Sequence, residues 1–173
     1  MLELQSPPPG LLFLSFLYRS DQLTQDQLVE KFENLYGECF SFVPSLNPLE
    51  TYYKKEMGSP LKRFFLVTKK TYPRDYLLTT KLSMVQEERI FSLDGKRFCN
   101  IDVGFLSLEN FQLATTKIYS HRIYLSQNIY SDLTYCFSQG TFQELPWTYP
   151  DYRDQEKKNF LLDCRQHLLQ LLK

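Results

Sequence analysis

The chain has 173 residues, 43% of them hydrophobic and 23% charged. This length and composition are typical of a globular domain with its own hydrophobic core, and they exclude a largely disordered chain. Twenty Lys and Arg residues balance twenty Asp and Glu residues, so the chain lacks the excess positive charge on which non-specific binding to nucleic acid or to an anionic membrane depends. We therefore expect neither nucleic acid nor a membrane as a partner.

Aromatic residues make up 16% of the chain, with 14 Phe and 12 Tyr against a single Trp. Large rings supply much buried area per residue, so we interpret them as core and strand residues. The alternative is a platform on which the bases of a single-stranded nucleic acid stack.

Cysteine and histidine residues are few and scattered. There is no C-x-x-C pair, and only two histidines accompany the four cysteines Cys39, Cys99, Cys136 and Cys164. This spacing fits neither a zinc site nor a small disulfide framework. We expect reduced, buried thiols in a cytoplasmic protein.

The apolar run Leu11–Leu17 is preceded by Glu3 and by no basic residue. It is much shorter than the roughly 20 apolar residues that a membrane-spanning helix needs. The run is instead typical of a strand that is buried on both faces.

The first part of the chain has the pattern β-α-β-β-α-β. Three consecutive prolines predict an extended lead-in over residues 1–10, and residues 11–173 are expected to form one domain. Residues 44–60 are expected to be a loop, because prolines interrupt them. Apolar runs and helical spacing predict strand Leu11–Tyr18, helix Asp21–Tyr36, strand Cys39–Val43, strand Leu61–Lys69, helix Arg74–Ser92 and strand Phe98–Val103.

This order predicts an α+β fold of the ferredoxin-like kind, in which two helices cover one face of an antiparallel four-stranded sheet. The remaining elements are expected to be a β-hairpin appended to this core and a C-terminal helix. In chain order they are a short helix Ser107–Leu113, the hairpin strands His121–Leu125 and Ile129–Phe137, a strand Phe142–Leu145 and the helix Asp154–Leu172.

Five separated stretches, in one order, resemble an uncharacterised bacterial family, domain-of-unknown-function family 4416. They are Y-Y-K-K-E-M-G at 52–58, D-G-K-R at 94–97, L-A-T-T-K at 113–117, S-H-R-I-Y-L at 120–125 and P-W-T-Y-P-D-Y-R at 146–153. The resemblance spans nearly the whole chain, and it implies no activity, because the family carries none that is established. Where the family usually shows N-x-D-P-G-Y, this chain keeps Asn100 and Asp102 but has Val103 in place of the proline.

The chain lacks the phosphate-binding loop G-x-x-x-x-G-K-[ST] of GTP- and ATP-binding proteins. Its nearest stretch, Met57–Pro60, lacks the glycines and has a proline where that loop needs a backbone donor. Neither nucleotide is therefore expected as a cofactor, and the identity of any cofactor stays unknown.

A candidate anion site lies at Lys117 and Arg122. Together with the hydroxyls of Thr115 and Thr116, these cations are suited to hold a phosphate or carboxylate, and Arg122 offers a bidentate fork. The alternative is a solvated surface in which Arg122 pairs with Asp132 or Glu109.

Asp102 is the candidate catalytic base or Mg²⁺ ligand, with Asn100 in support and His121 as an acid–base partner. Mg²⁺ is conceivable there, but no set of metal ligands is predicted. The alternatives are that Asp102 caps a helix or pairs with an Arg, and that His121 only donates to a carbonyl.

A second polar cluster lies on the predicted loop, where Tyr52, Tyr53, Lys55 and Glu56 precede Arg63. We expect Tyr53 and Arg63 to bind ligand and Glu56 to assist catalysis if this loop closes over the first cluster as a lid. The alternative is a surface loop held by Tyr rings.

Two functions follow from these patterns. The first is a cytosolic ligand-binding protein or enzyme that holds a small anionic molecule around Asp102, Lys117, His121 and Arg122. The second is a non-catalytic module that binds a protein partner on the open face of its sheet. The sequence does not predict the oligomeric state.

Overall fold

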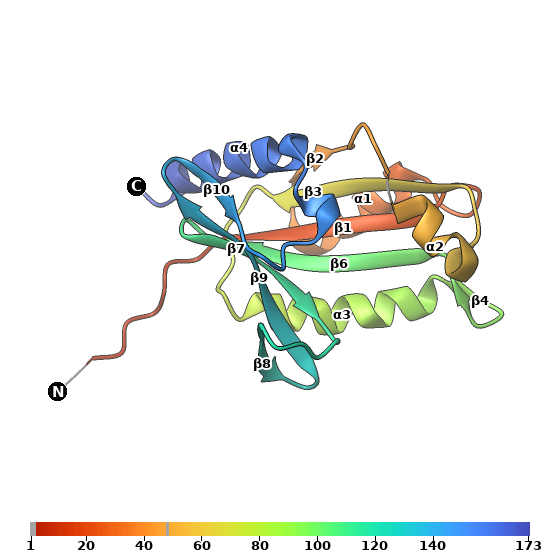
Figure 1. Cartoon of the computed structure of the whole chain (residues 1–173), viewed down its shortest axis with the longest axis horizontal. Coiled ribbons are helices and arrows are strands. Elements are labelled where there is room, and N and C mark those ends of the chain that lie inside the picture. Colours follow the sequence, from red (N-terminus) through yellow and green to blue (C-terminus); the bar gives the residue numbers. More distant parts are fainter. Residues whose placement is uncertain (1–2, 48) are drawn as a thin grey trace.

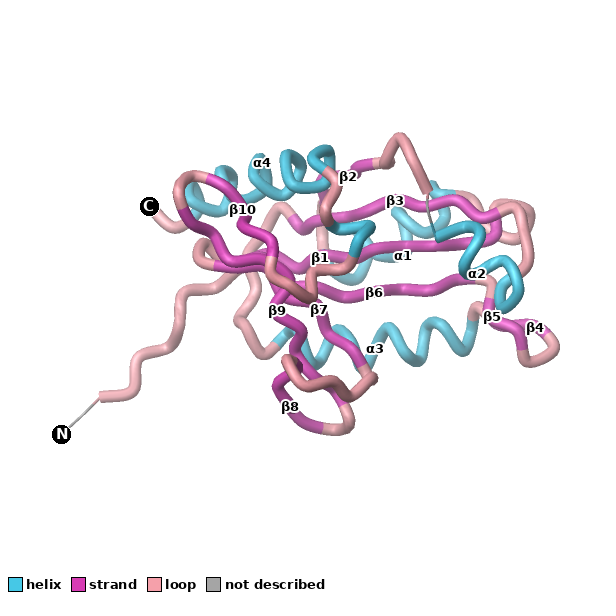
Figure 2. The backbone as a smooth tube through the Cα atoms, viewed as in Figure 1, coloured by secondary structure: helices cyan, strands magenta, loops and turns pink. Residues whose placement is uncertain are grey.

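The computed structural model describes residues 3–47 and 49–173. Within these residues the fold is α+β, with α-helices packed on a mostly antiparallel sheet (Figures 1 and 2). The helices are α1 (Gln25–Tyr36), α2 (Leu49–Met57), α3 (Tyr76–Ile90), the 3-10 helix η1 (Pro150–Tyr152) and α4 (Gln155–Leu171). The strands are β1 (Leu11–Arg19), β2 (Cys39–Phe42), β3 (Leu61–Thr68), β4 (Ser92–Leu93), β5 (Lys96–Arg97), β6 (Cys99–Leu106), β7 (Asn110–Thr115), β8 (Arg122–Ser126), β9 (Ile129–Ser138) and β10 (Thr141–Glu144).

Eight of the strands form one sheet in the order β10-β9-β7-β6-β1-β3-β2, with β8 paired to β9 outside this path. β4 and β5 form a separate small ribbon. All the strand pairs of the large sheet are antiparallel. β1 lies between β3 and β6, and its apolar side chains are buried on both faces of the sheet, as its uninterrupted apolar sequence predicts.

Each face of the sheet packs against helices. Side chains of β1 such as Leu12 and Phe16 join a core cluster beneath α1 and α3. Phe13 and its neighbours on the opposite face join a second cluster beneath α4. Figure 1 shows α1 behind the sheet and α2 in front of it. The expectation that one face of the sheet is open is therefore wrong, because α4 covers one end of that face and α2 covers the other.

Residues 44–60 are not only a loop, since α2 forms within them. Leu49, Tyr53 and Met57 recur every four residues along α2 and pack against Leu17 and Leu61 of the sheet. This short helix is stabilised by burial of one apolar stripe, which the flanking prolines and polar residues hide in the sequence.

The predicted helix at Ser107–Leu113 is also wrong. Ser107 closes a turn by accepting a hydrogen bond from the Asn110 backbone N–H at 3.2 Å, and residues from Asn110 onward form β7. Phe111 and Leu113 alternate along this strand and enter the second core cluster, so the period is that of a strand.

The predicted hairpin pairs as expected, with β8 against β9. It is not an appendage, because β9 also pairs with β7 and thereby extends the sheet beyond β6. The order of the whole sheet consequently differs from that of a four-stranded ferredoxin-like sheet. No helix in the described part of the chain is both long and apolar enough to cross a membrane.

The capping residues predicted from the sequence lie at the ends of α1 and α4. Thr24 and Gln27 form the expected capping box at the start of α1. Gly37 ends that helix with a φ of 78°, a conformation that glycine adopts at little cost. Asp154 caps α4 by accepting a hydrogen bond from the Glu156 N–H at 3.0 Å.

All four cysteines are free thiols, and Cys99 and Cys164 are buried at 0% and 2% exposure. Burial raises the pKa of both thiols, and it raises that of Cys39 to about 12. Because the thiolate is the reactive form, we expect iodoacetamide to leave Cys99 and Cys164 unmodified in the native protein at a pH of about 8. Peptide mass spectrometry measures this, with guanidinium-unfolded protein as the control; rapid labelling of either residue in the native state would contradict it.

Candidate functional site

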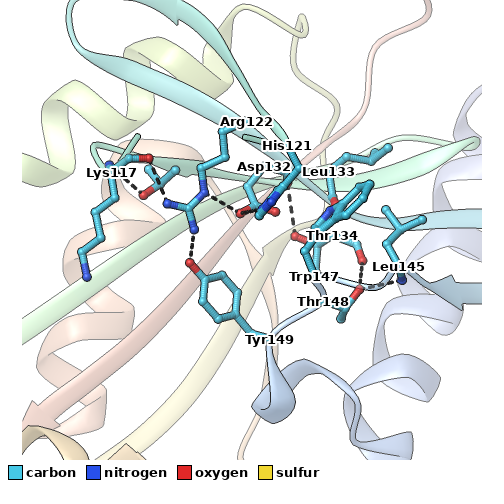
Figure 3. A network of polar contacts seen from close by, with 11 residues as sticks. Lys117, His121, Arg122, Asp132, Leu133, Thr134, Leu145, Trp147, Thr148 and Tyr149 are labelled. Atoms are coloured by element: carbon cyan, nitrogen blue, oxygen red, sulfur yellow. Dashed lines mark hydrogen bonds and ion pairs between the residues drawn. The ribbon is translucent and has the colours of Figure 1, made fainter. Parts of the chain in front are cut away.

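The buried Asp132 on β9 is the centre of a polar network, which we call the Asp132 network: His121, Arg122, Asp132, Trp147 and Tyr149 (Figure 3). Arg122 lies directly across from Asp132 in the β8–β9 pair, and its Nε donates to the carboxylate at 2.8 Å. The Nε2 of His121 lies 3.2 Å from the same carboxylate oxygen. The Asp132 side chain is only 2% exposed, so these two partners compensate a carboxylate removed from water.

The Arg122 guanidinium also forms hydrogen bonds with two neighbouring segments of the chain. It donates to the Lys117 carbonyl at 2.9 Å and to the Tyr149 hydroxyl, and the side chain is 6% exposed. The pairing of Arg122 with Asp132 was the structural alternative to an anion site, and the structure confirms it. An anion at Arg122 would therefore compete with protein acceptors that already occupy three sides of the guanidinium.

The segment 146–149 is hydrogen-bonded to β9 beside this network. The Trp147 ring stacks on His121 with centroids 4.8 Å apart, and its Nε1 donates to the Leu133 carbonyl at 2.8 Å. Thr148 donates to the Thr134 carbonyl at 2.7 Å. These bonds hold Tyr149 and the following η1 against the sheet, as Figure 3 shows.

The register of the sheet puts Asp102 on the same face as Asp132. Asp132 pairs with Leu113 of β7, and Leu113 pairs with Gly104 of β6. Paired residues on neighbouring strands share a face, and so do residues two apart on one strand. Asp102 therefore projects from this face, together with Ser15, its partner on β1.

Arg63 on β3 lies on this face too and is held by three contacts. Its guanidinium donates to Asp151 of η1 at 2.6 Å, and to the Ser15 hydroxyl from Nε at 3.3 Å and from Nη2 at 3.2 Å. Its side chain is 1% exposed, and its Cζ lies 4.7 Å from the centroid of the Phe65 ring. The buried ion pair between Arg63 and Asp151 links η1 to β3 in the middle of the sheet.

Asp102 differs from these paired groups. It is partly exposed, and across residues 3–47 and 49–173 no side chain forms a hydrogen bond or ion pair with its carboxylate. Asn100, two residues before it on the same face, is 7% exposed. The Asp102 carboxylate is therefore available to accept hydrogen bonds from a ligand.

Three tyrosines lie within the electrostatic reach of Asp102. Burial raises the pKa of Tyr53 on α2 to about 12, and the Asp102 charge adds to that rise. Burial also raises the pKa of Tyr149 and, by a larger amount, that of Tyr152; Asp102 contributes to both. The Tyr152 hydroxyl is buried and has no hydrogen-bond partner in the described residues.

We call this second group the Asp102 site: Ser15, Tyr53, Arg63, Asn100, Asp102 and Tyr152. Sequence reasoning named four of its members but missed Ser15 and Tyr152. Ser15 had a detectable signal, because it is the one polar residue inside the apolar run of β1. Tyr152 lies in the stretch 146–153 that carries the resemblance, but its neighbours in the site come from distant strands and could not be read from that stretch.

The other predicted site residues lie apart from Asp102 or point away from the Asp132 network. Glu56 pairs with Arg97 at 2.7 Å, and it lies on α2 rather than on a mobile loop. Thr115 accepts a hydrogen bond from the Lys117 N–H at 3.2 Å, and Thr116 is exposed. The Lys117 side chain extends away from Asp132 in Figure 3. His121 contacts Asp132 rather than Asp102.

The described residues contain no group of three or more His, Cys, Asp or Glu side chains that could hold a metal ion. A cavity of about 180 Å³ lies beside the first residues of β3, lined by Asn47, Lys62 and Arg63 among others. It shares only Arg63 with the Asp102 site.

The Asp132 network gives a stability prediction. Replacing Asp132 with Ala leaves the buried Arg122 guanidinium without its counter-charge, so we expect a loss of about 3–5 kcal/mol in the free energy of unfolding. Urea denaturation measures the loss. Asp163→Ala, at an exposed carboxylate on α4, is the matched control, with an expected change within about 0.5 kcal/mol. A loss below about 1 kcal/mol for Asp132→Ala would show that the pair contributes no more than a surface salt bridge.

The five stretches that carry the sequence resemblance are joined by side-chain contacts. Glu56 and Arg97 join the first two stretches, Arg122 joins the third and fourth through the Lys117 carbonyl, and Tyr149 joins the fourth and fifth. Neither the curated proteins nor the solved structures include a match to this chain. A family model described as Domain of unknown function (DUF4416) matches residues 8–168. The chain therefore belongs to the DUF4416 family.

Proposed function

We propose that the chain binds a small polar molecule at the Asp102 site. The observation that carries this proposal is the Asp102 carboxylate itself, which projects from a central strand of the sheet and has no partner among the described side chains. The nearby charges of Arg63 and Arg122 are each paired, at 2.6 Å and 2.8 Å. Asp102 is thus the acceptor on this face that is free to take a ligand.

The surroundings support a ligand site rather than an ordinary surface carboxylate. α2 carries Tyr53 to one side, and η1 places Tyr152 against Arg63, with 5.8 Å between the Arg63 Cζ and the ring centroid. Polar groups on rigid strands, with aromatic residues around them, are the usual composition of small-molecule sites. The buried Arg63–Asp151 pair holds this composition in place.

The ligand proposed here contacts other residues than those expected from the sequence. The sequence predicts an anionic molecule held by Lys117, His121 and Arg122. Arg122 donates to three protein groups and His121 contacts Asp132. We therefore propose that the ligand binds at Asp102 instead. A carboxylate only accepts hydrogen bonds, so the ligand must supply the donor.

We also propose that β1, α1, β2, β3, α3 and β6 form a split β-α-β-β-α-β unit, onto which α2 and strands β7 to β10 are added. The strand order β6-β1-β3-β2 supports this, as does the position of α1 and α3 against the same core cluster. Under this reading the added strands and η1 form one side of the Asp102 site.

A ligand screen tests the site. We expect at least one molecule from a library of polar metabolites to raise the melting temperature, because binding to the native state stabilises it. The shift should disappear in Asp102→Asn, which keeps the shape of the side chain and removes its charge. Asp163→Asn is the matched control and should keep the shift. A hit that stabilises Asp102→Asn as much as the parent would place the ligand elsewhere.

A second function is favoured by the exposed apolar residues around β8. Ile118 is 75% exposed and Ile123 70%, and Tyr119 and Tyr124 are 65% and 57% exposed. β8 pairs with β9 alone, and the exposed residues Ile123–Leu125 carry no charge or proline of the kind that normally protects an edge strand. This surface suits the pairing of β8 with the β8 strand of a second copy.

Sedimentation velocity tests this second function. We expect the parent to associate as its concentration rises and Ile123→Lys to stay monomeric, because an edge lysine opposes strand pairing. Leu46→Lys, at a residue 76% exposed, is the control and should associate like the parent. A parent that stays monomeric up to about millimolar concentration would exclude specific pairing.

A further inference from the structure

We propose that the ligand of the Asp102 site is a small organic cation, an amine or guanidine whose positively charged N–H groups pair with the Asp102 carboxylate beside the tyrosine rings. This inference rests on the proposed function and names the chemical class of its ligand. It is carried by the charge balance of the face, by the buried Tyr152 hydroxyl and by the aromatic surroundings.

The charged side chains around Asp102 are paired with one another, and Asp102 is not. Arg63 is neutralised by Asp151 at 2.6 Å, and Arg122 by Asp132 at 2.8 Å. The buried Lys157 ammonium on this side of the sheet pairs with Asp154 at 3.7 Å. These three pairs leave no net charge, so Asp102 adds one negative charge, with which no side chain in the described part of the protein forms an ion pair. A cationic ligand removes this imbalance, whereas an anionic ligand increases it.

The neighbouring charges beyond β6 do not alter this sign. Arg97 pairs with Glu56 at 2.7 Å and with Glu88 at 2.9 Å, and Lys81 donates to the Ile101 carbonyl at 3.2 Å. Two cations and two carboxylates balance in this group. The excess negative charge therefore stays at Asp102.

The Tyr152 hydroxyl is the second, independent observation. Tyr152 is 3% exposed, and its Oη has no hydrogen-bond partner in the part of the chain that the structure describes. Buried hydroxyls in native proteins are nearly always paired, so the unpartnered Tyr152 hydroxyl has its hydrogen-bonding capacity free for a ligand group. Oη can accept a hydrogen bond from an ammonium or guanidinium N–H.

The aromatic rings suit the same class of ligand. Tyr53 comes from α2 and Tyr152 from η1, and the rings of Tyr52 and Tyr53 are in edge contact with centroids 4.9 Å apart. Burial keeps the phenols of Tyr53 and Tyr152 neutral by raising the pKa of each. Neutral phenol rings attract a cation through their faces, and they add no charge that would repel one.

A divalent metal is the competing cation. Beside Asp102 in the sheet, the Asn100 amide and the Ser15 hydroxyl offer oxygen atoms on the same face, and Ser15 already accepts from Arg63. The described residues contain no cluster of three metal-binding side chains, whereas Mg²⁺ and Ca²⁺ need about six oxygen ligands. An organic cation needs only one carboxylate and the aromatic surroundings.

Calorimetry and thermal shift with four classes of probe test the inference on the full chain. The probes are 1,4-diaminobutane, agmatine and arginine methyl ester as organic cations, 1,4-butanediol as a neutral analogue, succinate as an anion, and Mg²⁺. We expect at least one organic cation to bind and raise the melting temperature, with no effect from the other classes. Binding should weaken about ten-fold or more in Asp102→Asn, the loss expected for a hydrogen bond to a charged group, and should be unchanged in Asp163→Asn.

The salt dependence gives a readout that needs no variant. Binding of an organic cation to Asp102 should weaken as ionic strength rises, because salt screens the pair. Asp102-dependent binding of butanediol, succinate or Mg²⁺ in place of the amines would overturn the cation inference and leave the proposed ligand site intact. Failure of a broad polar library to bind at all would overturn both. Organic cations that bind Asp102→Asn as tightly as the parent would overturn the assignment to Asp102.

Discussion

The burial of β1 on both faces is the constraint on which the rest of the structure depends. An apolar strand in the centre of a sheet can be stable only if other elements cover both sides of it. α1 and α3 cover one side, and α2 and α4 share the other. Between α2 and α4 the same face carries Ser15, the single polar residue within the apolar part of β1. The polar groups of neighbouring strands gather where this serine lies.

Paired charges then organise that face. Arg63 joins β1 and β3 to η1 through Ser15 and Asp151, and Arg122 joins β8 and β9 to Tyr149. Both guanidiniums are buried, and each donates three hydrogen bonds that link neighbouring segments. Each needs its carboxylate because an unpaired buried charge is costly. Asp102 lies on the same face without such a partner. The two arginines are paired with carboxylates, whereas Asp102 has no paired side chain among the described residues. This difference supports the proposal that Asp102, and not Arg122, binds a ligand.

The segment 146–153 connects the two groups. Trp147 and Tyr149 contact the Asp132 network, while Asp151 and Tyr152 contact Arg63. This short stretch of chain is hydrogen-bonded to β9 at one end and to Arg63, in the middle of the sheet, at the other.

The long elements and the class of the fold can be predicted from the sequence. β1, α1, β3, α3, β9 and α4 follow from apolar period and capping residues, because these signals lie within a single element. The sequence also supplied Asn100, Asp102, Arg63 and Tyr53 as candidate site residues. Three features became apparent only in the folded protein: Ser107–Leu113 is mostly strand, residues 49–57 are helical, and the hairpin extends the sheet. Those segments are short, and packing against distant residues outweighs their weak local preferences. Tertiary structure also decided which charges are paired: the partners of Arg63 and Arg122 are set by strand register, and no local pattern in the sequence encodes the neighbours that register brings together.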